Sequence, residues 1–126
     1  MKISILLPYK ENFSPIYPGA VSLFVKDTVK ISKFRKNITV YGNTNLKKIY
    51  NLLYKNIDLK KTIIESGSKI YVNEFLKFEV NNPSDLIEIH NRPNYFHLIY
   101  EKTTKQKLVL YFHNDPLTMT GSRSIK

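Results

Sequence analysis

The side chains best suited to chemistry stand together near the end of the chain. His113, Asn114 and Asp115 directly follow the apolar run LVLYF at 108–112. A histidine titrates near neutral pH, and a neighbouring carboxylate can orient it for proton transfer. His113 and Asp115 are therefore candidate catalytic residues, and Asn114 in the same loop is a candidate for substrate binding. The structural alternative is that His113 only makes a hydrogen bond at the end of a strand.

A second polar cluster follows a second apolar run. His90, Asn91 and Arg92 come after DLIEI at 85–89. In an open α/β sheet, the loops at the carboxyl ends of the strands converge on one crevice. Asn91 and Arg92 are therefore candidates for lining the crevice that also receives His113. The alternative gives Asn91 to a turn and Arg92 to the charged surface.

A third candidate site lies at the start of the strongest helical pattern in the chain. Gly19 and Ala20 follow a loop with three prolines, at 8–18, and open an amphipathic segment over 19–34. Unpaired backbone N–H groups and the helix dipole favour an anion at such a position, and glycine lets a ligand come close. The alternative is that Gly19 only relieves a tight turn after Pro18.

Several chemistries are disfavoured by the motifs that the sequence lacks. No GxGxxG follows the first predicted strand, and no GxxxxGK[ST] or GxSxG occurs. Dinucleotide-dependent oxidation, P-loop nucleotide hydrolysis and a hydrolase nucleophile elbow are therefore poorly supported. His90, His113 and Asp115 have metal-binding side chains but no recognised ligand spacing, so no metal site is predicted. The chain contains no cysteine, which fits a reducing cytoplasm.

The hydrophobic pattern predicts alternating strands and helices. Strands are expected at 2–7, 38–41, 62–64, 85–90 and 107–112, and helices at 19–34, 68–80 and 94–103, with a helical turn or two within 46–53. Ser68 is the predicted N-cap of the second long helix. Such alternation is typical of a parallel sheet with helices on both faces. We therefore predict an α/β, Rossmann-like, doubly wound parallel sheet that forms a single domain over residues 1–126.

The chain is strongly basic, with a formal net charge of +10 at pH 7. Only Arg35, Arg92 and Arg123 are arginine among its 20 basic residues, and the lysines are scattered. Specific recognition of nucleic acid favours arginine, so we predict no nucleic-acid partner and a solvated basic surface. Peripheral contact with an anionic membrane surface is a further possibility. No apolar run is long enough to span a membrane.

Taken together, four stretches resemble the N-terminal, acceptor-side half of family 4 glycosyltransferases of the GT-B type. They are KISILLPYKENFSPIYPGAVSLFVKDT, ITVYG, PSDLIEIHNRPNYF and LVLYFHNDPLTMTGSRS. The resemblance implies retaining transfer of a sugar from a nucleotide-sugar to a saccharide or lipid-linked acceptor in envelope polysaccharide synthesis. The nucleotide-sugar is a co-substrate, and no cofactor or metal is implied.

The resemblance also gives roles to individual positions. Gly19 matches the glycine that approaches the donor diphosphate, and His113 matches a histidine near the transferred sugar. Asn91 and Arg92 match a segment lining the cleft. Orientation of His113 or of the acceptor by Asp115 is our own inference, not a rule of the family.

The chain departs from the family in one large respect, because residues 1–126 show no donor-binding second domain. We therefore expect a cytoplasmic half-enzyme that is incomplete at its C-terminal end and inactive alone, with peripheral contact at the inner face of the membrane as a further expectation. Whether it is an enzyme at all stays open. One alternative is a non-catalytic binding module that docks to a separately encoded donor-domain chain or to a carbohydrate. A basic nucleic-acid binder is the second alternative, and steep salt dependence of binding would support it.

Overall fold

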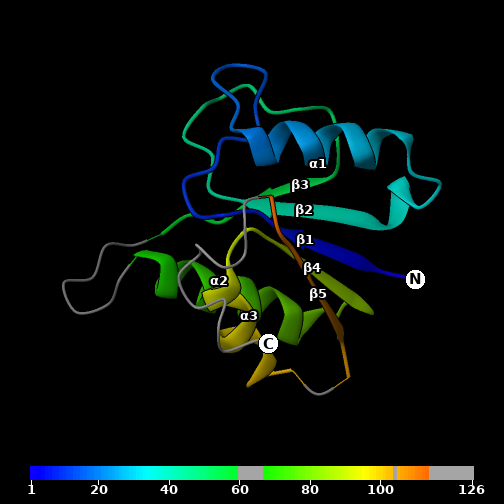
Figure 1. Ribbon diagram of the computed structural model, residues 1–126, viewed down its shortest axis with the longest axis vertical. Helices are drawn as coiled ribbons and strands as arrows, with labels where there is room; N and C mark the ends of the chain where they lie inside the picture. The colour runs from blue at the N-terminus through cyan, green and yellow to red at the C-terminus, as the bar shows by residue number, and fades with distance from the viewer. Residues whose placement is uncertain (60–66, 104, 114–126) are drawn as a thin grey trace.

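The computed structural model describes residues 1–59, 67–103 and 105–113 (Figure 1). The strands within these ranges are β1 (Ile3–Leu6), β2 (Ile38–Gly42), β3 (Tyr54–Asn56), β4 (Leu86–His90) and β5 (Lys107–Tyr111). The helices are α1 (Ala20–Ile31), α2 (Gly67–Asn81) and α3 (Pro93–Tyr100), and a short 3₁₀ turn, η1 (Arg35–Asn37), precedes β2.

The described strands form one all-parallel sheet in the order β3-β2-β1-β4-β5. Helix α1 covers one face, and α2 and α3 cover the other (Figure 1). The prediction of an α/β fold with a parallel sheet between helices is confirmed. This arrangement is compatible with a Rossmann-like fold.

Two hydrophobic clusters, one on each face, hold the layers together. Alternate residues of a strand point to opposite faces, so β1 contributes to both clusters. The α1 face buries Ile3, Ile5, Leu7, Phe13, Val21, Val25, Val29, Ile38 and Val40. The opposite face buries Leu6, Tyr41, Ile57, Tyr71, Val72, Phe75, Leu76, Ile87, Ile89, Tyr95 and Ile99. Because β1 is buried on both sides, its register with β2 and β4 is fixed.

The least regular part of the chain differs from the prediction. Residues 46–53 contain bends and no helix, and the strand β3 follows at Tyr54. Tertiary contacts decide this, since Val40 donates a backbone hydrogen bond to Leu53 O and the Tyr54 ring stacks on Phe13. Ser68 is not an N-cap, because it lies inside α2. The strand predicted at 62–64 falls outside the described residues.

Tyr71 ties α2 to the carboxyl end of the central strand. Its hydroxyl donates a 2.7 Å hydrogen bond to the backbone oxygen of Leu7, and the side chain is fully buried. Burial raises the pKa of Tyr71 well above its usual range, so the phenol stays a hydrogen-bond donor. This contact holds the start of the β1–α1 loop against the helix layer on the other face.

We expect Tyr71→Phe to lower the free energy of unfolding by about 1–2 kcal/mol, because a buried carbonyl loses its donor. Tyr100→Phe is the matched control, since Tyr100 is 66% exposed, and it should change stability little. Urea denaturation of the two variants and the wild type measures both effects. Equal midpoints for the two variants would show that the buried hydrogen bond contributes nothing.

Candidate functional site

The candidate site lies where the chain leaves two neighbouring strands for opposite faces of the sheet. After β1 the chain leads to α1 on one face, and after β4 it leads to α3 on the other (Figure 1). Since β1 and β4 are paired, their outgoing loops separate at the carboxyl edge. Ligands of open α/β sheets bind at such a position.

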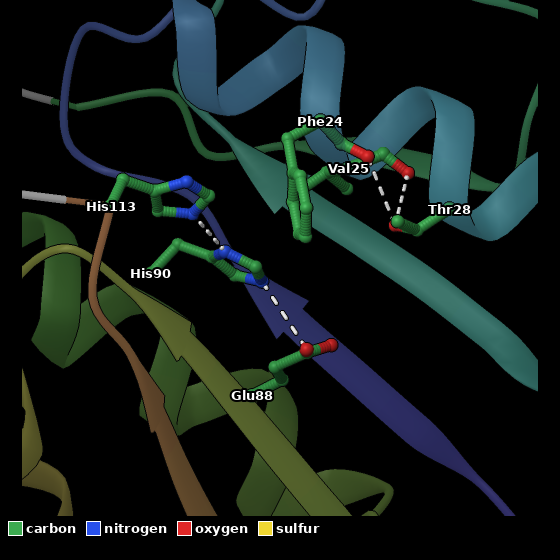
Figure 2. A network of polar contacts seen from close by, with 6 residues as sticks. All are labelled: Phe24, Val25, Thr28, Glu88, His90 and His113. Atoms are coloured by element: carbon green, nitrogen blue, oxygen red, sulfur yellow. Dashed lines mark hydrogen bonds and ion pairs between the residues drawn. The ribbon is translucent and has the colours of Figure 1, made fainter.

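A pair of histidines forms the centre of the site. His90 ends β4 and His113 follows β5. The Nδ1 atom of His90 lies 2.9 Å from the Nε2 atom of His113 (Figure 2). The register pairs His90 with Tyr111, and the two rings stack with centroids 5.1 Å apart. His90 is only 1% exposed. The parallel pairing therefore brings together imidazoles that are 23 residues apart in the sequence.

Asn91 holds the backbone on which His113 stands. Its φ of 58° is in the left-handed region, which asparagine tolerates better than most residues. Asn91 N–H donates to Tyr111 O at 2.7 Å, and its side-chain oxygen accepts from His113 N–H at 3.2 Å. The exposed Arg92 donates to the backbone oxygen of Asn91. Asn91 is therefore a turn residue that positions His113, and Arg92 lies at the rim.

Helix α1 covers the histidine pair from the other side. The Phe24 ring meets His113 edge to face, with centroids 4.9 Å apart (Figure 2). Burial, and then the neighbouring His90 imidazole, lower the pKa of His113 below its ordinary 6.5, while Glu11 and Glu88 oppose that shift. His113 is consequently neutral at pH 7, and a neutral imidazole can accept a hydrogen bond or a proton.

The carboxylate of Glu11, a side chain of the protein itself, lies at the start of α1. Glu11 Oε2 accepts a 3.1 Å hydrogen bond from the backbone N–H of Ser22 in the first turn. A Cβ on Gly19 would lie 1.6 Å from the same oxygen. Glycine is needed here for close approach of the carboxylate, since its φ of −76° suits any residue. The exposed Ala20 begins the helix beside it.

The loop after β2 does not join the histidines. Phe13 N–H donates to Thr44 Oγ1 at 3.0 Å, so this loop packs on the far part of the β1–α1 loop. The third histidine, His97, lies on α3. Asn114 and Asp115, named from the sequence as binding and catalytic residues, fall outside the described residues.

Within the described ranges, no group of three or more metal-binding side chains is arranged around a common point. The helices of those ranges are also too short or too polar to cross a membrane.

Sequence reasoning missed two carboxylates that the structure places near His113. Glu88 lies two residues before His90 on β4, so both side chains face α1, and this spacing of polar residues in an apolar strand was a usable signal. Glu11 gave a weaker signal. The first turn of α1 contains no acidic residue, which leaves its N-terminus for a carboxylate from elsewhere.

Comparison with protein-family models, curated proteins and solved structures found no match for this chain.

We expect Glu11→Ala and Gly19→Ala each to reduce the free energy of unfolding by about 1 kcal/mol, because each removes the carboxylate from the N-terminus of α1. The losses should not add in the double variant, because the three atoms nearest to the new Cβ all belong to the Glu11 carboxyl group. Urea denaturation of the four proteins gives this double-mutant cycle. Additive losses would show that Gly19 and Glu11 act independently.

Proposed function

We propose that this chain is the acceptor-side, Rossmann-like half of a GT-B glycosyltransferase resembling family 4. The complete enzyme would transfer a sugar, with retention, from a nucleotide-sugar to a saccharide or lipid-linked acceptor in envelope polysaccharide synthesis. The observation that carries the proposal is the position of His113. It stands at the carboxyl edge of the sheet, beside His90 and against Phe24 of α1, the helix that begins directly after Gly19.

The chemistry of this edge suits recognition of a sugar and a phosphate. A neutral His113 imidazole can accept a hydrogen bond from a sugar hydroxyl. The exposed Arg92 guanidinium on the neighbouring loop can meet a phosphate, while Asn91 keeps both loops in place. Asp115 and Asn114 follow His113 directly and are proposed to contact the acceptor.

Glu11 adds a condition to this proposal. Its carboxylate lies against Gly19, where the resemblance puts the donor diphosphate. Two anions cannot share the N-terminus of α1 at low cost, because like charges repel strongly at contact distance. Donor binding therefore requires the Glu11 side chain to swing away from α1. The flexible side chain allows that movement, and the helix N–H groups are then free for phosphate.

The first test is an NMR titration of the chain with UDP, GDP and their sugar conjugates. We expect weak binding with amide shifts confined to residues 9–23, 90–92 and 113. Glu11→Gln should bind the nucleotide diphosphates on the order of tenfold more tightly, because one like-charge contact is removed. Glu74→Gln, on the exposed side of α2, is the matched control and should change nothing.

Two results would contradict the proposal. Absence of shifts at these loops with every nucleotide would remove the donor from this edge. Equal affinities of the wild type and Glu11→Gln would show that the diphosphate does not meet the start of α1.

A second candidate function is a binding module, and one observation favours it. On the face that α1 covers, β5 leaves Val109 39% and Tyr111 41% exposed, and Phe24 beside them is 37% exposed. An apolar strip next to the candidate site suits docking of a second domain or chain. A crevice for a nucleotide-sugar needs two sides, and the described residues supply one.

Mixing the chain with a separately encoded donor-domain chain distinguishes the two functions. Sugar transfer that needs both chains supports the half-enzyme, and a stable complex without transfer supports the binding module. In an active pair, His113→Ala should reduce kcat by at least about a hundredfold, the lower end of the range for loss of a positioned catalytic group. Unchanged turnover, with an unchanged circular dichroism spectrum, would remove His113 from the reaction.

We further propose that the protein acts in the cytoplasm and contacts anionic membranes peripherally. The support is its net charge of +10, since each basic side chain near an anionic surface contributes about 1 kcal/mol. Sedimentation with phosphatidylserine vesicles at rising salt tests this. Binding to DNA or RNA under the same conditions would support the nucleic-acid alternative instead.

A further inference from the structure

His90 is an unusual residue for the end of a buried strand, because one of its ring nitrogens lacks a hydrogen bond. Nδ1 contacts His113, but among the described residues no acceptor is aligned with the fully buried Nε2. The nearest carboxylate oxygen, Glu88 Oε1, lies 3.5 Å from it (Figure 2). That distance is long for a hydrogen bond, but at this range the negative charge of the carboxylate still interacts strongly with the imidazole ring.

The Glu88 carboxylate decides which nitrogen of His90 carries the hydrogen. A neutral imidazole has one N–H and one lone pair. A lone pair on Nε2 would face the negative oxygen of Glu88, whereas an N–H directs its positive end toward it. The hydrogen therefore belongs on Nε2, and Nδ1 of His90 carries the lone pair.

This assignment sets the state of the second histidine. In the 2.9 Å contact between His90 Nδ1 and His113 Nε2, one nitrogen must donate and the other must accept. Since His90 Nδ1 accepts, His113 Nε2 must donate. Nδ1 of His113 then holds the free lone pair, and it points away from His90 (Figure 2).

We propose that Glu88 and His90 are positioning residues that lock His113 in the Nε2–H tautomer and present its Nδ1 as a hydrogen-bond acceptor or base. The tautomer follows from the geometry alone. Its use on a substrate hydroxyl rests on the glycosyltransferase function proposed above.

The groups around His113 agree with this state. Glu88 and His90 face it from β4, Tyr111 from β5, and Glu11 from the β1–α1 loop, while α1 contributes the uncharged Phe24. Arg92 on the neighbouring loop binds the backbone oxygen of Asn91. Burial and His90 lower the pKa of His113 against the opposing influence of the two carboxylates, which keeps the lone pair available at pH 7.

Long-range ¹H–¹⁵N NMR spectra of the three histidines test the proposal directly, because the ring ¹⁵N shifts report each tautomer and pKa. At pH 7.5 we expect His90 and His113 both as Nε2–H tautomers in the wild type. A hydrogen on Nδ1 of His113 would overturn the proposal without any variant. His97 on α3 is the internal reference.

Two variants test the roles of Glu88 and His90. Glu88→Leu should convert both histidines of the pair to tautomer mixtures, and Glu74→Leu on the exposed side of α2 should not. His90→Phe keeps the aromatic stack on Tyr111 but removes the Nδ1 acceptor, so His113 should become a mixture of tautomers. Unchanged tautomers in Glu88→Leu, with the His97 signals still native, would show that the carboxylate does not set them.

These results are separable from the proposed function. Nε2–H tautomers together with no response to any nucleotide-sugar would keep the positioning role and reject the donor site. A response to a nucleotide-sugar together with a mixture of His113 tautomers would keep the donor site and reject the positioning role. In an active two-chain enzyme, Glu88→Leu should lower kcat severalfold and shift its acidic limb, with KM little changed.

Discussion

The parallel pairing of β4 with β1 on one side and β5 on the other is the constraint on which the rest of the structure depends. It separates the outgoing loops of β1 and β4 to opposite faces and places His90 next to Tyr111. The two hydrophobic clusters fix this pairing, because a shift of one residue would move the apolar side chains of β4 to the wrong faces. The contacts of His90 with Tyr111 and His113 are a consequence of this register.

The same register explains why polar groups are tolerated at the buried edge. His90 is fully buried. The free-energy cost of burying its polar ring is offset by the contact with His113, the stack on Tyr111 and the nearby Glu88 carboxylate. Asn91 then closes the turn and holds the backbone of His113. His90 and His113 are therefore held by other polar residues and by backbone, so the geometry of this pair is fixed before any ligand arrives.

The sequence was informative wherever a pattern was local. Apolar runs and helical spacing predicted β1, β2, β4, β5 and the helices α1, α2 and α3. The expectation that the polar residues after β4 and β5 meet at one edge agrees with the pairing of these strands. Strand β3 was missed because it forms through long-range contacts, with Val40 supplying the hydrogen bond and Phe13 the ring stack. Local periodicity at 46–53 instead suggested a helix.

The contacts between residues of the candidate site also could not be predicted from local patterns. The sequence offered either a bound anion or a tight turn at Gly19, but it could not show that the carboxylate of Glu11, eight positions earlier, lies against this glycine. His90 was noted at a strand end, yet only the β4–β5 register reveals its contact with His113. Such contacts depend on loop paths and registers that no short motif encodes.

Electrostatic interactions connect His113 with the start of α1, where the Glu11 carboxylate lies. The carboxylates of Glu11 and Glu88 both favour the charged form of His113, whereas burial and His90 favour the neutral form. Movement of Glu11 away from α1 would remove one of the two favourable charges, but a diphosphate arriving at the same helix end would restore a negative charge there. The protonation of His113 would then depend on the ligand at α1, even though the two positions belong to different loops.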